Sequence, residues 1–368
     1  MALTIPQRPP WTNRYKANWD EAYQRVMAWW EGGSFDRPLV IAHIVKPSAP
    51  SFVSASRNLT WAVRDLSVSY HIEAARHHLE NTLFLAETAP AVATGYGSFL
   101  WMLGAMAGAR VHYTEESGTT WVEAIPNLYE RPLPEFDSAC PPYAFTIQMI
   151  HRYAQEFGFD CILGANAMVD PLTTLSMMRG PEQFCLDLID QPEMVLRWRD
   201  RLWELFLDIV TGWRTARAEH GRREEINWTG LWAPGDMDAL QCDFSAMLSP
   251  AMFRHFELPE LEREADFFDY ALWHLDGPEE IQHLELILGV DKIRGIQWAD
   301  NPYAPSLDYV DLFKLIRRHQ RSVICSVKTA AEAIAMTKEI GKDGLALCIT
   351  GLKNETELEK TLEALQRL

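Results

Sequence analysis

The sequence predicts an α/β protein built as a (β/α)8 (TIM) barrel. Short apolar segments alternate with longer amphipathic segments over the last two-thirds of the 368 residues, and polar residues or glycine follow each apolar segment. No GxGxxG follows the first predicted strand and no GxxxxGK(S/T) occurs, which disfavours a doubly wound nucleotide-binding fold. We expect one barrel domain over residues 1–368, with an N-terminal helical extension at residues 1–35 and a hairpin insertion.

The first part of the chain supplies the extension and the first strand. Apolar residues at helical spacing predict a helix from Trp19 to Trp30, and Gly32 and Gly33 end it. The continuous apolar run at residues 38–45 is typical of a buried parallel strand. We then expect a helix over residues 65–86, a strand end with a tight turn at 92–97, and the hairpin over 114–122.

The remaining elements repeat regularly. We expect strands at residues 161–167, 226–232, 270–277, 292–298, 322–328 and 345–351. We expect helices at residues 144–157, 181–188, 192–220, 250–267, 278–288, 309–319 and 330–340. A last helix follows Asn354, which stands at capping-box spacing from Glu357.

Composition and charge exclude several classes of protein. With 34 Lys and Arg against 51 Asp and Glu, the net charge of −17 disfavours nucleic-acid binding, which needs clustered basic residues. No apolar run is long enough for a membrane span, and the polar, proline-rich start does not resemble a secretory signal. The six cysteines form no CxxC pair, as is typical of reduced thiols. We therefore expect a cytoplasmic protein, and the 14 tryptophans favour a pocket for a flat or apolar small molecule.

His274 and Asp276 form the sharpest candidate site. They lie two residues apart at the end of one predicted strand, so both side chains point to the same face. In a barrel, active sites lie at the carboxyl ends of the strands. The pair could share a proton or bind a metal; alternatively, His274 is a buried structural histidine held by Asp276.

Other candidates follow the same rule of position. Asp243 and Ser245 lie in a strand-to-helix loop, and Ser249 already provides a helix cap, which leaves both of them free for another role. Cys348 is a soft metal ligand or a small core residue. Candidate substrate-binding residues at the other strand ends are Asn166, Asp170, Trp228, Trp232, Gln297 and Trp298.

Several segments resemble the uroporphyrinogen decarboxylase superfamily. These segments are Phe35–Val40, Arg179–Val195, Cys242–Leu261, Trp273–Val290 and Ile293–Asn301. The resemblance covers most of the chain and implies a (β/α)8 barrel with a deep cleft at its carboxyl-terminal face. It also suggests a homodimer.

The superfamily implies two chemistries. One branch consists of cobalamin-dependent methyltransferases and demethylation enzymes, which hold zinc through a His-x-Cys pair and a distant Cys. The corresponding residues here are His274, Asp276 in place of the first Cys, and Cys348. The resemblance thus implies a zinc site, with a corrinoid supplied by a partner protein or as free cobalamin. Asp243 would contact the substrate.

The other branch decarboxylates uroporphyrinogen without a cofactor, and its arginine-rich motif is not found near the start of this chain. We therefore favour a methyltransferase or demethylase component. The first alternative is a cofactor-free decarboxylase acting on a tetrapyrrole or small carboxylate, in which Asp243 or Asp276 stabilises a cationic intermediate and His274 transfers the proton. The second is a non-catalytic protein that binds a tetrapyrrole or corrinoid.

Overall fold

The computed structural model describes residues 8–34, 36–54, 60–93, 99–114, 119–164 and 167–368. Its helices are α1 Trp19–Trp30, α2 Trp61–Asp65, α3 Val68–Asn81, α4 Met102–Met106, α5 Pro141–Phe157, α6 Pro171–Arg179, α7 Pro181–Asp190, α8 Pro192–Ala218, α9 Pro250–Phe256, α10 Leu258–Phe267, α11 Leu284–Leu288, α12 Val310–Arg318, α13 Ala330–Ile340 and α14 Glu355–Gln366. Its strands are β1 Leu39–Ile41, β2 Ile44–Val45, β3 Thr82–Leu83, β4 Ala91–Val92, β5 Val111–Thr114, β6 Thr119–Val122, β7 Ile162–Leu163, β8 Glu225–Ile226, β9 Trp232–Ala233, β10 Met237–Leu240, β11 Tyr270–Leu275, β12 Ile293–Trp298, β13 Ser322–Val327 and β14 Leu345–Ile349.

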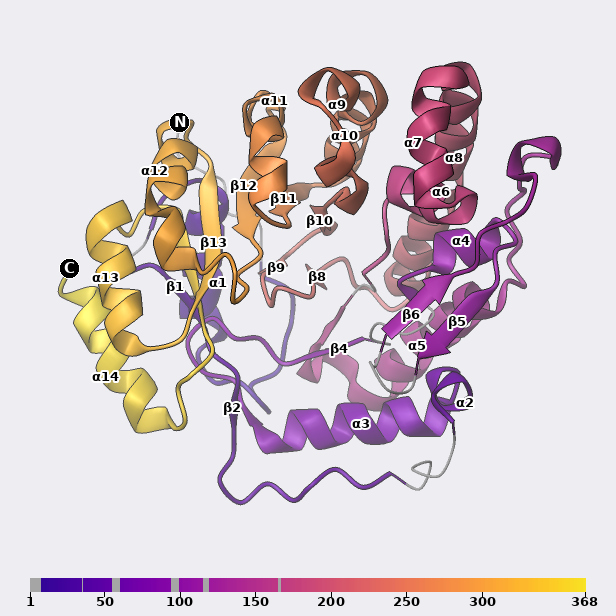
Figure 1. Ribbon diagram of the computed structural model, residues 1–368. Coiled ribbons are helices and arrows are strands. Elements are labelled where there is room, and N and C mark those ends of the chain that lie inside the picture. Colours follow the sequence, from indigo (N-terminus) through magenta and orange to yellow (C-terminus); the bar gives the residue numbers. More distant parts are fainter. Residues whose placement is uncertain (1–7, 35, 55–59, 94–98, 115–118, 165–166) are drawn as a thin grey trace.

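A parallel sheet confirms the predicted α/β class. Six strands pair in the order β1-β14-β13-β12-β11-β10, so the last strand of the chain lies beside the first. A second parallel pair joins β4 to β7. Helices of the second half lie on the outer side of these strands (Figure 1). A closed ladder of eight strands, as a complete barrel requires, is not shown in the described part of the chain.

Helix α1 closes the inner side of the sheet at the amino-terminal ends of the strands. Trp29 and Trp30 are both 1% exposed. The Trp29 indole donates to the Val323 carbonyl (3.3 Å), near the start of β13, and the Trp30 indole donates to the Trp232 carbonyl (3.0 Å). Burying indoles of this size contributes about 2–3 kcal/mol each. The opposite, carboxyl-terminal ends of the strands are thereby left for a functional site.

Several predicted elements are confirmed. The helices over 19–30 and 330–340 have the predicted bounds, and the hairpin forms from β5 and β6, starting slightly earlier than expected. Asn354 caps α14 by accepting from the Glu357 amide (3.0 Å).

Other elements differ from prediction for identifiable reasons. Residues 226–232 do not form one strand: β8 and β9 pair antiparallel, because Gly230 (φ +81°) turns the chain between them. The next parallel strand is β10, which the sequence analysis missed. The helix over 250–267 breaks after Phe256, because Pro259 favours a new helix start in α10.

Three further differences concern helix lengths and numbers. The helix expected over 65–86 forms only as α3, and its last residues become β3. Residues 278–288 begin as a 3₁₀ helix, Pro278–His283, before α11. Helix α6 was not expected.

In the described part of the chain, no helix is both long and apolar enough to cross a membrane.

Candidate active site at the carboxyl ends of the strands

His274 is held in one orientation by the neighbouring strand. It lies on β11 opposite Gln297 on β12, and its Nδ1 is hydrogen-bonded to Gln297 Oε1. The Gln297 amide nitrogen donates to the Trp298 carbonyl (2.6 Å), so the amide oxygen faces His274. Nδ1 therefore carries the proton, and in the neutral ring Nε2 presents a lone pair.

Asp276 faces the free nitrogen of this imidazole. His274 Nε2 lies 3.5 Å from Asp276 Oδ1, because residues two apart share one face of the strand. His274 is 8% exposed, whereas the Asp276 side chain is 51% exposed. The pair is therefore anchored in the sheet at one end and open to solvent at the other.

The surroundings of His274 favour its protonated form. Burial acts against the imidazolium, but hydrogen bonds to Asp276 and Gln297 and the charges of Asp276 and Asp243 outweigh it, and the pKa is raised. A histidine in this environment binds a proton more tightly than a free imidazole does, so it can act as a general base and then as a general acid.

Asp243 joins the pair from the adjacent strand. It opens the 3₁₀ helix η4 (Asp243–Met247) just after β10, and Thr173 Oγ1 accepts from the Phe244 amide at 3.0 Å. The surrounding protein shields the Asp243 carboxylate from water, and this raises its pKa. The charge of Asp276 raises the pKa further, whereas His274 lowers it. The structure thus brings together His274, Asp276, Asp243 and Gln297, all expected at the site.

Trp228 connects His274 to a cavity. Its ring meets the imidazole edge-on, with centroids 4.6 Å apart at 88°. The same tryptophan lines a cavity of about 250 Å³ together with His43, His78, Asn227 and Gly230. Burial, followed by the charges of His43 and His77, lowers the pKa of His78 to about 4, so this wall is neutral at physiological pH. The cavity suits a small, uncharged group.

Cys348 does not join His274 and Asp276. It lies on β14, three strands from β11 in the sheet order, and its thiol donates to the Thr229 carbonyl at 3.7 Å. Burial raises its pKa to about 12, so it is a neutral thiol. In the described part of the chain, these three residues do not form a group with ligand atoms at metal-binding spacing.

Two tryptophans expected in the pocket lie in the core instead. Trp232 is fully buried on the inner side of the sheet, where it contacts Trp19 edge-on and donates to the Glu87 carbonyl (2.8 Å). Trp298 is also fully buried, and its indole donates to the Ala304 carbonyl at 3.1 Å. Trp232 is covered by α1 and Trp298 by the loop that follows β12, so neither ring lines the pocket.

The remaining candidates have other positions. Asp170 caps α6 by accepting from the Thr173 amide (2.7 Å) and is 5% exposed. Ser245 is fully buried behind the site, and its carbonyl accepts from His283 Nε2 at 2.9 Å. Asn166 lies outside the described residues.

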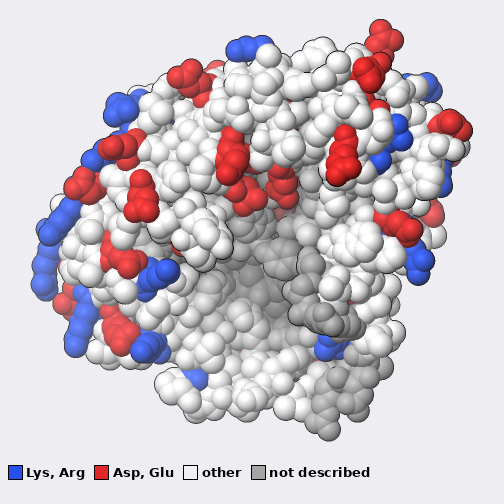
Figure 2. Space-filling model, viewed as in Figure 1, with Lys and Arg blue, Asp and Glu red and all other residues white. Residues whose placement is uncertain are grey.

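Sequence reasoning missed three residues near the site. Glu280 accepts from the Asp276 amide (3.1 Å), and burial raises its pKa to about 7. His43 lies two residues beyond β1, a position that the strand-end rule could have identified. His78 comes from α3, and periodicity alone assigns it only to a helix. Figure 2 shows Asp and Glu side chains gathered along one side of the hollow on this face.

Comparisons with known proteins support the fold. No protein-family model and no curated protein matches this sequence. Among solved structures, the chain is similar to a methyltransferase from Methanosarcina mazei, with a TM-score of 0.59 and 16% identity, over 93% of this chain and 97% of that one. The protein therefore has the α/β fold of a methyltransferase over nearly its whole length.

Proposed function

We propose that this protein is a methyltransferase-type enzyme in which His274 accepts the proton of a small methyl acceptor. The observation that carries the proposal is the arrangement of His274, with Nδ1 held by Gln297 and Nε2 facing Asp276 at the carboxyl-terminal end of the sheet. The similarity in fold to a methyltransferase supports the reaction class.

The acceptor would occupy the cavity beside Trp228 as a thiol or hydroxyl compound. As its sulfur or oxygen attacks the methyl carbon, the S–H or O–H proton passes to His274 Nε2, and the bond between methyl and donor breaks with its electrons remaining on the donor. Asp276 then stabilises the imidazolium, and Gln297 keeps the ring in position.

A corrinoid, free or carried by a partner protein, would supply the methyl group. The cavity of about 250 Å³ is smaller than the roughly 300–1,000 Å³ of pockets for drug-sized ligands, so a whole corrinoid does not fit inside it. The donor would therefore be presented at the cavity mouth. The zinc set of His274, Asp276 and Cys348 does not fit this structure, because Cys348 is three strands away, and no step is assigned to a metal there.

Decarboxylation is the second candidate. The raised pKa values of His274 and Asp243 favour a site able to protonate the carbon that remains after carbon dioxide leaves. In that reaction the C–C bond breaks, its electrons stay on the substrate carbon, and His274 returns a proton to it.

An assay with two readouts separates these reactions. The purified enzyme is mixed with methylcobalamin and a panel of small thiols and alcohols, and demethylation of the cobalamin is followed by absorbance; carbon dioxide release is measured in parallel with small carboxylates. We expect His274→Gln to lower methyl transfer by about 10²–10⁴-fold, the usual contribution of general base catalysis. The exposed His319→Gln serves as the control and should retain full activity.

Two results would overturn the proposal. One is carbon dioxide release without methyl transfer, which would establish the second candidate. The other is methyl transfer that His274→Gln leaves unchanged, which would place the acceptor elsewhere. Tight binding of a corrinoid without any turnover would identify a binding protein instead.

A further inference from the structure

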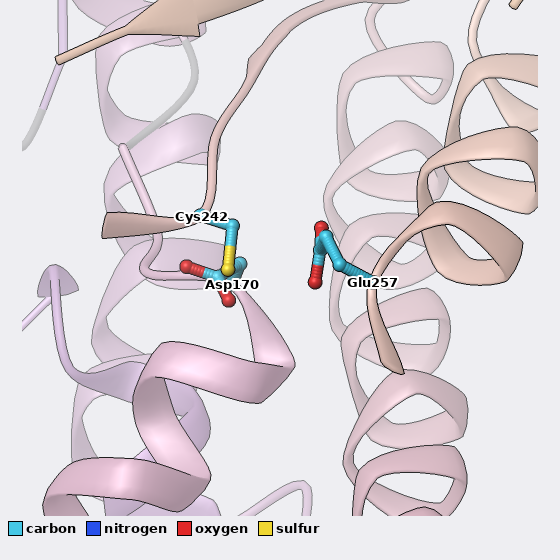
Figure 3. A group of neighbouring side chains, drawn as sticks. All are labelled: Asp170, Cys242 and Glu257. Carbon is cyan, nitrogen blue, oxygen red and sulfur yellow. The ribbon is translucent and has the colours of Figure 1, made fainter. Parts of the chain in front are cut away.

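A second group of chemically active side chains lies behind the candidate active site. Asp170, at the start of α6, Cys242, after β10, and Glu257, between α9 and α10, place one ligand atom each within 4.8 Å of the others. Their exposed fractions are 5%, 1% and 1%. Figure 3 shows the Glu257 carboxyl group extending toward Asp170 and Cys242 from the opposite side.

Two oxygens of this group have no hydrogen-bond partner in the described part of the chain. Asp170 uses Oδ1 to cap α6, but its Oδ2 is unpaired. Glu257 Oε2 is also buried and unpaired. An unpaired buried carboxylate oxygen is costly, so its presence here indicates a missing partner rather than a stabilising contact.

The charges around the group are unbalanced. Glu260 and Glu264 are 1% and 3% exposed, and they interact electrostatically with Glu257. In the described part of the chain, the buried cation that contacts these carboxyl groups is Arg199: its Nε lies 3.0 Å from Glu260 Oε1, and its Nη2 donates to Asp200 at 2.6 Å; Arg263, which also acts on Glu264, is largely at the surface. One shared guanidinium does not compensate four buried carboxylates.

We propose that Asp170, Cys242 and Glu257 bind one divalent transition-metal ion, of which zinc best suits a thiol with two carboxylates. Cysteine sulfur and carboxylate oxygen are both ordinary zinc ligands, and the thiol disfavours calcium and magnesium.

The ion would fasten the active-site loop to the helices. Cys242 directly precedes Asp243, and the Phe244 amide donates to Thr173 Oγ1 on α6 at 3.0 Å. A metal joining Cys242 to α6 and to the α9–α10 junction would fix the position of Asp243 at the mouth of the site. This role is structural, and it does not depend on the proposed reaction.

Metal content tests the proposal directly. The full-length protein, purified without chelator, is stripped, reloaded with zinc and measured by inductively coupled plasma mass spectrometry. We expect about one zinc per chain in the wild type and at least a tenfold weaker affinity in Cys242→Ser. Asp170→Asn is the second variant, because the asparagine oxygen still caps α6 while the metal loses a carboxylate.

Two controls locate the ion. Cys325→Ser changes a cysteine on β13 that is 1% exposed, as Cys242 is, and His274→Gln changes the candidate active site. Both variants should keep the full zinc content. Cobalt(II) loaded in place of zinc should show the near-ultraviolet thiolate band in the wild type and in Cys325→Ser, but not in Cys242→Ser.

Either of two outcomes would refute the site. If the wild type takes up no zinc or cobalt after reloading, the buried carboxyl groups hold protons instead. If zinc is lost in His274→Gln and retained in Asp170→Asn, the ion belongs to the active site. Should Cys242→Ser fail to fold, the Asp170→Asn result and the wild-type cobalt spectrum decide the question.

Discussion

Removal of the Glu87 carboxylate should be one of the most destabilising single changes in this chain. Glu87 is fully buried and accepts two hydrogen bonds from Arg37, at 2.8 and 2.9 Å. It also accepts from the Val40 amide at 2.8 Å, in β1. Arg37 is 4% exposed, so no solvent replaces the carboxylate when it is lost.

The expected magnitude follows from the burial of both partners. Glu87→Leu removes a carboxylate that Arg37 contacts at 2.8 Å and Arg25 at 3.5 Å. It leaves the buried Arg37 guanidinium uncompensated, which costs about 3–5 kcal/mol of unfolding free energy. That is a large share of the roughly 5–15 kcal/mol available to a folded domain. As a matched control, Glu363→Leu disrupts an exposed pair with Arg367, whose side chains are 66% and 77% exposed, and should change stability by less than about 1 kcal/mol.

Urea unfolding of a double-mutant cycle measures the coupling. Arg37→Leu/Glu87→Leu removes both charges, and we expect it to be more stable than Glu87→Leu alone, because replacing a buried pair by apolar side chains is close to neutral. A double variant as unstable as Glu87→Leu would refute the reasoning, since the loss would then come from packing and not from the stranded charge.

Three further predictions concern stability. Burial lowers the pKa of Lys16 from 10.5 to about 8, so the unfolded chain binds this proton more tightly than the folded chain does. Stability should therefore rise by roughly 3 kcal/mol between these pH values, and Lys16→Met should abolish that rise in urea unfolding measured at pH 7.5 and 10.5. Gly295→Ala places a Cβ 2.9 Å from the Trp29 ring and should lower stability by about 1–3 kcal/mol, measured as a fall in Tm. Asn354→Ala loses the cap that accepts from Glu357 and should cost about 1 kcal/mol, whereas Asn354→Asp should cost little.

The parts of the fold that sequence periodicity could predict are those in which local pattern and packing agree. Helix α13 has apolar residues at helical spacing, strands β11 to β14 are short segments rich in apolar residues, and all appear where expected. Strand β10 reads Met-Asp-Ala-Leu after a Pro-Gly pair, a polar and short pattern typical of a loop. It forms a strand because β11 pairs with it, and pairing between distant segments is not visible in local periodicity.

The candidate site was predictable to the extent that strand ends identify it. His274, Asp276 and Gln297 came from position and side-chain alternation, which the register of β11 and β12 supports. The distance from His274 to Cys348 depends on how many strands separate them, and composition contains no such information. The core position of Trp232 depends on α1, whose tryptophans fill the inner side of the sheet.

The charges at the mouth of the site bear on which substrates it accepts. Asp243, Asp276 and Glu280 all act electrostatically on His274 or on one another. Their negative charges disfavour a substrate that carries several carboxylates itself, and the cavity wall formed by His78 and Trp228 is neutral. A neutral thiol or alcohol meets no such repulsion, and in the proposed reaction its proton would pass to His274. The charge distribution therefore favours methyl transfer to a small neutral acceptor over decarboxylation of a polycarboxylate tetrapyrrole.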